Sequence, residues 1–137
     1  MKFSIEFSEV YPHPVGEVWK ALTEREALGA WLMETDFAPE PGREFTLWCD
    51  DGAGGTDTYR CRLLEFEPER RMLWSWTLDS RRTEPPTTVE FRIEPVAGGT
   101  RVTIVHGGDR DEATIDRFRS GWPAKLEQLA ATLSARP

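Results

Sequence analysis

Between residues 45 and 106 the apolar side chains recur at every second position in five separate runs, and no other feature constrains the fold as strongly. Period-two alternation is typical of β-strands that bury one face and expose the other. Segments rich in glycine and proline separate the runs and favour turns. The sequence therefore predicts a meander of antiparallel strands. The apolar positions are Phe45, Leu47 and Cys49; Tyr59, Cys61 and Leu63; Met72, Trp74, Trp76 and Leu78; Val89, Phe91 and Ile93; and Val102, Ile104 and His106.

The segment before these runs predicts one further strand followed by two short helices. Residues 3–7 alternate in the same way as the later strands. Residues 15–22 then carry apolar side chains at helical spacing. A second helix is predicted from Glu24 to Leu32, with Thr23 as its cap and Glu26 three residues later, which is the pattern of a capping box.

After the last run, apolar residues step by three or four and predict a long amphipathic helix. Arg117 and Lys125 fall off the apolar stripe of this helix. Pro123 lies in its middle, close to Gly121, and should kink the helix or make it restart near Arg119. A stripe this long must dock on another surface, and the concave face of the sheet is available. Its members are Ile115, Phe118, Trp122, Leu126, Leu129 and Leu133.

Length and charge narrow the classes of function. A chain of 137 residues fits one domain, 1–137. The balance of 17 basic against 24 acidic residues gives a net charge of -7, which disfavours nucleic acids and anionic membrane surfaces as partners. No apolar segment approaches the roughly 20 residues that cross a bilayer, and the first residues lack the apolar block of a signal peptide, so we expect a cytoplasmic protein. Cys49 and Cys61 are expected to be reduced, with a disulfide between adjacent strands as the alternative.

Six short motifs occur in a fixed order along nearly the whole chain. They are Pro14-x-x-x-Val18-Trp19-x-Ala21-Leu22-Thr23, Leu28-x-x-Trp31, Pro41-Gly42-x-x-Phe45, Glu67-Pro68-x-x-Arg71-x-Leu73-x-x-Trp76, Gly99-Thr100-x-Val102-Thr103-Ile104-x-His106-x-Gly108 and Gly121-Trp122-x-x-x-Leu126-x-x-Leu129. In this order the chain resembles the START-like (SRPBCC) superfamily. It is most similar to the bacterial single-domain proteins named after the activator of the heat-shock protein 90 ATPase.

The resemblance implies an α+β helix-grip fold: a curved antiparallel sheet of about six or seven strands around a long C-terminal helix, with two short helices after the first strand. It also implies a cavity between sheet and helix. The inward stripes then predict the residues that contact a ligand, although the same aromatic side chains would also suit a filled core. The predicted lining is Phe45, Leu47, Tyr59, Cys61, Leu63, Trp74, Trp76, Phe91, Ile104, His106, Phe118 and Trp122.

Three functions are open at this point. The first is a binding protein for a small hydrophobic or aromatic molecule, with no cofactor and no metal. The second is an enzyme of cyclase or hydrolase type with His106 and Tyr59 as candidate catalytic residues, but these groups define no mechanism, and a structural His106 bonded to a carbonyl near Gly107 and Gly108 is the alternative. The third is a co-chaperone that stimulates a heat-shock protein 90 type ATPase, which only the family name implies. Relatives often pair, so a homodimer is also open.

The remaining charged groups suggest no site. Arg81 and Arg82 lie beside a predicted turn, where charge is usually a solvated rim. One inward histidine and two scattered cysteines give little support to a metal site.

Overall fold

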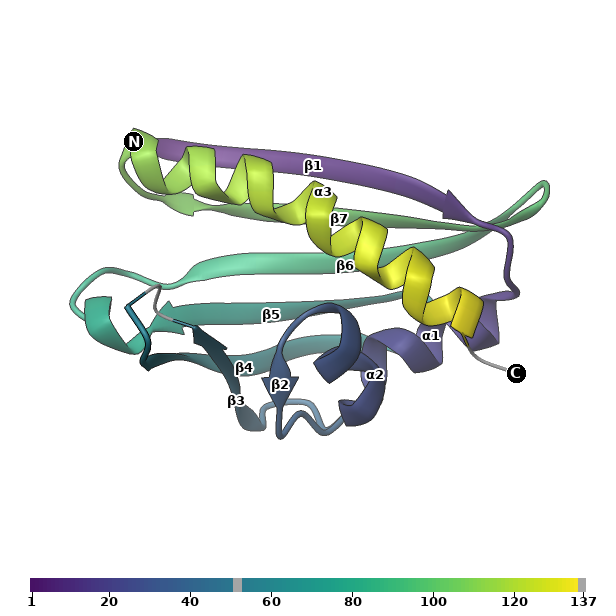
Figure 1. The fold of residues 1–137 in the computed structure, drawn as a ribbon, viewed down its shortest axis with the longest axis horizontal. Helices are drawn as coiled ribbons and strands as arrows, with labels where there is room; N and C mark the ends of the chain where they lie inside the picture. Colours follow the sequence, from purple (N-terminus) through teal and green to yellow (C-terminus); the bar gives the residue numbers. More distant parts are fainter. Residues whose placement is uncertain (51–52, 136–137) are drawn as a thin grey trace.

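Seven antiparallel strands form one curved sheet in the computed structural model, which describes residues 1–50 and 53–135 (Figure 1). The order is β1-β7-β6-β5-β4-β3-β2, so consecutive strands from β2 to β7 are neighbours and β1 pairs with β7. This confirms the predicted meander. The strands are β1 (Lys2–Tyr11), β2 (Glu34–Thr35), β3 (Glu44–Asp50), β4 (Thr56–Glu67), β5 (Arg71–Leu78), β6 (Thr87–Val96) and β7 (Gly99–Asp109).

The five apolar runs lie on β3 to β7 and face the interior, as their alternation predicts. Each run has at least one completely buried member, such as Leu47, Leu63, Trp74, Phe91 and Ile104. Between Leu63 and Glu65 the pairing of β4 with β5 shifts by one residue, so Leu64 is an extra residue in β4. Such a bulge increases the local twist and bends the strand, and it adds to the curvature of this sheet.

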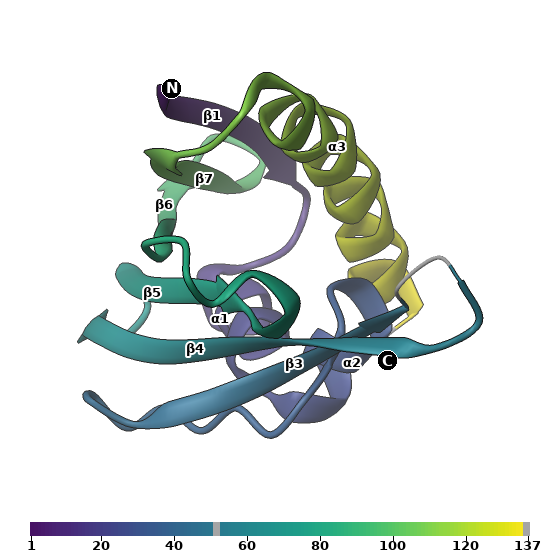
Figure 2. The same cartoon turned by 90° about the vertical axis from the view of Figure 1, so that its left-hand side faces the viewer.

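Helix α3 (Glu112–Ala135) runs across the concave side of the sheet (Figure 2). Its apolar stripe is buried except for Phe118, which is half-buried. The hydroxyl of Tyr11 donates to the carbonyl of Leu126 at 2.8 Å and so ties the end of β1 to the helix. The predicted grip of a curved sheet on a long helix is therefore confirmed.

Pro123 does not interrupt α3, and the predicted restart near Arg119 is wrong. The buried side chains of Trp122 and Leu126 hold the segment on both sides of the proline against the sheet, and this packing offsets the lost backbone bond. Figure 1 shows the helix bending about halfway along its length. Pro123 is the twelfth of its 24 residues, and a bend is the usual effect of an internal proline.

Two short helices, α1 (Val15–Thr23) and α2 (Arg25–Trp31), close one end of the concave face (Figure 1). The predicted capping box is wrong. Thr23 is the last residue of α1, and its hydroxyl donates to the carbonyl of Trp19 at 2.8 Å, while Glu24 precedes α2 without a side-chain capping bond. Because the two helices adjoin, the acceptor one turn earlier is within reach of the hydroxyl.

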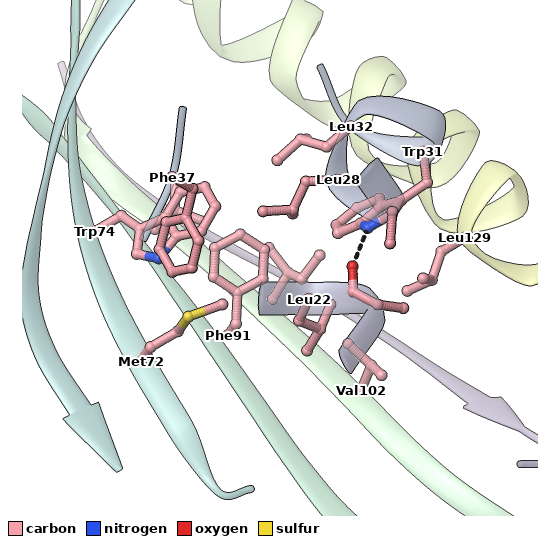
Figure 3. Packing of buried hydrophobic residues seen from close by; sticks show 14 of the residues in the cluster. Leu22, Leu28, Trp31, Leu32, Phe37, Met72, Trp74, Phe91, Val102 and Leu129 are labelled. Carbon is pink, nitrogen blue, oxygen red and sulfur yellow. Dashed lines mark hydrogen bonds between the residues drawn. The ribbon is translucent and has the colours of Figure 1, made fainter. Parts of the chain in front are cut away.

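Aromatic side chains fill the interior at this end (Figure 3). Phe37, from the loop after β2, packs against both Phe45 and Trp74, with ring centroids 5.0 and 5.3 Å away. Phe91 lies 4.6 Å from Trp74. The indole N–H of Trp31 donates to the carbonyl of Ala21 at 2.8 Å, the dashed line in Figure 3, and this bond joins α2 to α1. This half of the interior is a solid core.

A short 3-10 helix, η1 (Asp79–Arg81), follows β5 and lies at the same end of the sheet as the first turns of α3 (Figure 1). Within residues 1–50 and 53–135, no helix combines the length and the apolar character that a membrane span requires.

The neighbouring leucines of β4 offer a direct test of this core. Leu63 is fully buried, whereas Leu64 is 42% exposed. Leu63→Ala should lower the free energy of unfolding by about 2–5 kcal/mol, because it removes buried apolar surface and leaves a cavity. Leu64→Ala should change it by less than about 0.5 kcal/mol. Urea denaturation followed by circular dichroism measures both, and equal losses would contradict the inward and outward assignment.

Candidate ligand pocket

A cavity of about 240 Å³ lies between the first half of α3 and the strands β4, β5 and β6. Arg81 and Arg117 line it and are also exposed, so the cavity opens to solvent beside them. We call this cavity the pocket. Its walls are Leu32, Met33, Tyr59, Trp76, Leu78, Arg81, Thr87, Arg110, Thr114, Arg117, Phe118, Gly121, Trp122 and Lys125.

Aromatic rings form the apolar part of the wall. The ring centroid of Trp76 is 4.8 Å from that of Tyr59 and 5.6 Å from that of Trp122, so the three side chains form one continuous surface. Phe118 joins them from the preceding turn of α3. Walls of this kind bind apolar molecules through contact area and ring packing.

Gly121 explains why α3 leaves room here. A Cβ atom built on Gly121 would meet no atom within 4 Å outside its own stretch of helix, so the space beside it is empty. Arg117 and Lys125 lie four residues before and after it and therefore on the same side of the helix. The missing side chain of Gly121 thus opens the wall between two cations.

A chain of hydrogen bonds runs from the wall into the layer behind it. The indole N–H of Trp122 donates to Nδ1 of His106 at 3.0 Å. Nδ1 therefore carries no proton, and Nε2–H donates to the hydroxyl oxygen of Thr87 at 3.0 Å. Burial, with a smaller contribution from the charge of Arg110, lowers the pKa of His106 to about 3. The imidazole is consequently neutral in this tautomer.

Gly108 makes space for the Thr87 end of this chain. A Cβ atom on Gly108 would lie 2.8 Å from Cγ2 of Thr87, closer than side chains approach one another. Its φ of 155° also lies at the edge of the region that favours glycine. The glycine after the last apolar run therefore lets the end of β7 approach Thr87 in the pocket wall.

The two candidate catalytic residues lie in different places. His106 is completely buried, and it contacts the wall residues Trp122 and Thr87 instead of the expected carbonyl near Gly107. Tyr59 lines the pocket, and burial is the main cause that raises its pKa to about 12, so the phenol keeps its proton at neutral pH. His106 is poorly suited to abstract a proton, because its Nδ1 already accepts a hydrogen bond from Trp122 and its pKa is about 3. The geometry therefore favours a structural role for His106.

The predicted lining residues divide between the pocket and the core. Tyr59, Trp76, Phe118 and Trp122 line the pocket. The others do not, because Trp31 and Phe37 fill the space in front of much of the sheet. Those that pack in the core are Phe45, Leu47, Cys61, Leu63, Trp74, Phe91, Ile104 and His106.

The sequence reasoning missed the polar part of the wall. Arg81 was assigned to a solvated rim, but it lines the pocket together with Arg110, Arg117 and Lys125. The sequence did contain one signal for Arg117 and Lys125, because both share a helix side with Gly121. Arg117 is also one residue from Phe118, and Lys125 is three residues from Trp122. The polar residues Thr87 and Thr114 complete this part of the wall.

A second hollow, of about 370 Å³, lies between β1 and α3. Its wall includes the exposed carboxylates Glu9 and Glu127 and a single aromatic ring, that of Phe7. With two carboxylates, one aromatic ring and mostly exposed residues around it, this hollow is a weaker candidate for a small apolar ligand.

Comparison with known proteins places the chain in a family. The family model described as "Activator of Hsp90 ATPase homolog 1-like protein" matches residues 12–134. The chain belongs to this family. No curated protein matches the sequence.

Several solved structures share the fold of this family member. MLL2253 from Mesorhizobium loti is 26% identical, with a TM-score of 0.87 over 98% of this chain and 99% of its own. CV1439 from Chromobacterium violaceum is 22% identical, with a TM-score of 0.85 over 97% and 98%. DynU16, a protein of the dynemicin biosynthetic locus, is 22% identical, with a TM-score of 0.83 over 96% of this chain and 47% of its own. The last two likenesses show the fold alone.

In the described part of this family member, the residue types that commonly bind metal ions do not form a cluster. Among the described residues, no three His, Cys, Asp or Glu side chains are placed to hold one ion. Cys49 and Cys61 are not joined in a disulfide, and they lie opposite Asp57 and Phe45 in the β3–β4 pairing. Burial raises the pKa of the Cys61 thiol, which makes it a poor nucleophile.

The neutral His106 predicts how the stability of this family member depends on pH. Its folded-state pKa is about 3, below the value of about 6.5 in an unfolded chain. The stabilisation is therefore complete above about pH 6.5 and is lost as the pH falls, by about 1.4 kcal/mol per unit, because only the unfolded chain takes up this proton. Urea denaturation at about pH 6 and 5, above the range where carboxylates titrate, should show this slope.

His106→Gln is the matched variant for this measurement. The amide does not titrate, so the slope between about pH 6 and 5 should fall close to zero even if the variant is less stable at neutral pH. The same slope in both proteins would show that another group causes it.

Proposed function

We propose that this family member binds a small hydrophobic or aromatic molecule in the pocket. The observation that carries the proposal is the empty volume of about 240 Å³ beside a continuous aromatic wall, in a chain whose interior is solid at the other end. The volume is somewhat below the roughly 300 Å³ expected for a drug-sized ligand. It suits a smaller molecule, or one whose end projects into solvent at Arg81 and Arg117.

The family context supports the same function. The helix-grip fold commonly encloses hydrophobic ligands, and one structural neighbour, DynU16, comes from a biosynthetic locus. A cyclase or hydrolase in this pocket has less support, because the buried, neutral His106 does not line it. Cytoplasmic residence, a homodimer and a chaperone partner stay predictions.

A substitution that fills the pocket tests the proposal. Gly121→Leu should place its side chain in the empty volume, because a Cβ atom at this position meets no atom within 4 Å outside its own stretch of helix. It should also not weaken the helix, because leucine favours a helix interior more than glycine does, by up to about 1 kcal/mol. The probe is N-phenyl-1-naphthylamine, a neutral dye that fluoresces in apolar surroundings. The unchanged protein should bind it, and Gly121→Leu should weaken the binding at least about tenfold by removing the contact area.

Ala131→Leu is the control for this experiment. It places the same leucine side chain at an exposed position of α3 that does not line the pocket, so dye binding should not change. Circular dichroism checks that both variants fold. If the unchanged protein fails to bind the dye, or if Gly121→Leu binds it equally well, the pocket is not the binding site.

A further inference from the structure

The geometry points to an anionic ligand for this pocket: a small molecule with an apolar body and one acidic group, such as a carboxylate. This inference rests on the proposed function and adds the class of ligand. Among the described residues, the wall contains four cationic side chains and no Asp or Glu. The whole chain carries a net charge of -7, so a cationic wall runs against the average of its surface.

Two of the four cations share one carboxylate partner. Arg110 lies 3.0 Å from Glu84, and Arg81 lies 3.5 Å from the other oxygen of the same residue. Arg110 also donates to the carbonyls of Asp109 and Pro85. These contacts hold the two arginines beside the mouth of the pocket and leave little of the charge of Arg110 for a ligand.

Arg117 and Lys125 are the uncompensated pair. Arg117 donates to the hydroxyl of Thr114 at 3.3 Å, and Lys125 donates to the carbonyl of Leu32 at 2.7 Å. Within the part of the chain that the structure describes, neither lies within 4 Å of a carboxylate. Asp111 is near enough for Arg117 to contribute to its lowered pKa, although the bonds from Thr114 are the larger cause. A ligand anion would supply the partner that these two cations lack.

Their positions suit an acidic group held over Gly121. Arg117, Gly121 and Lys125 occupy one side of α3 at intervals of four residues. The two cations are therefore separated by about 12 Å along the helix axis. Long, flexible side chains at both ends of the open space can reach towards its centre, where Gly121 allows the closest approach. The aromatic wall of Trp76, Tyr59 and Trp122 is left for the apolar body.

The hydrogen-bond chain behind the wall presents one more donor. Because Nε2–H of His106 donates to Thr87, the hydroxyl of Thr87 still has its own proton to give. Thr87 is buried and lines the pocket, and its one side-chain bond among the described residues is the bond to His106. The buried indole N–H of Trp76, another wall residue, has no acceptor in the same part of the chain. A wall rich in donors and poor in acceptors selects a ligand that brings acceptor oxygens.

A pair of dyes that differ in one charged group tests the inference. The first is 8-anilinonaphthalene-1-sulfonate, and the second, N-phenyl-1-naphthylamine, has the same rings without the sulfonate. We expect the unchanged protein to bind the sulfonate at least about tenfold more tightly. Arg117→Gln should remove about tenfold of that affinity and leave the affinity for the neutral dye unchanged, since only the charged hydrogen bond is lost. Lys125→Gln should act in the same way.

Arg119→Gln is the matched control. Arg119 lies two residues from Arg117 on α3 but pairs with Asp116 at 3.1 Å and does not line the pocket, so the affinity for either dye should not change. Fluorescence titration at fixed ionic strength measures every affinity. Gly121→Leu should weaken the binding of both dyes.

The possible failures are distinguishable. If the neutral dye binds in the pocket but neither Arg117→Gln nor Lys125→Gln weakens sulfonate binding, the anionic class is wrong and the proposed function stands. Equal losses from Arg119→Gln, or sulfonate binding that survives Gly121→Leu, would place the anion on the general surface and also overturn the inference. If neither dye binds the unchanged protein, the proposed function itself fails.

Discussion

The structure depends on one constraint: a single curved sheet has an apolar concave face that only the rest of the same chain can cover. Helix α3 provides most of the cover, and its contact with the sheet combines burial of Trp122, Leu126 and Leu129 with the bond from Tyr11 to the carbonyl of Leu126. One helix is narrower than the sheet, since an α-helix with side chains is about 10–12 Å across and neighbouring strands are about 5 Å apart. At one end α1, α2 and Phe37 fill the remaining width. At the other end α3 provides most of the cover over β4, β5 and β6, and the pocket lies there.

The sequence predicted the elements in which apolar residues recur at a regular spacing. Alternation identified the strands, and their central residues, such as Leu63 and Phe91, are buried as expected. Helical spacing identified α3. Both succeed because burial of one face imposes a period on the sequence, and a period is visible without the partner surface. The sequence did not show which half of the concave face is filled, because Phe37 belongs to a loop without any period and its position depends on tertiary contact with Phe45 and Trp74.

The errors at the ends and the middle of helices have a similar origin. Thr23 and Glu26 have the spacing of a capping box, but α1 continues to Thr23 and offers its hydroxyl another acceptor. Pro123 would break an isolated helix, but α3 gains enough from its buried face to continue through it. Likewise, Arg117 and Arg119 are both off the apolar stripe, and only the surface opposite decides that one lines a pocket while the other faces solvent. Local patterns give the preference of a segment, and tertiary packing decides where two preferences compete.

Several features that oppose stability gather at one wall. Gly121 occupies a helix interior, where it is about 1 kcal/mol less favourable than alanine, and the space beside it is empty. Arg117 and Lys125 on either side have no carboxylate partner in the described part of the chain, and Trp76 opposite has an unpaired indole N–H. A core arranged for stability alone would hold a larger apolar side chain in place of Gly121. Departures of this kind are expected at functional sites, where local stability is given up for recognition. That these features face the same 240 Å³ is the physical reason for assigning the pocket, rather than the solid core beside it, to the function of this fold.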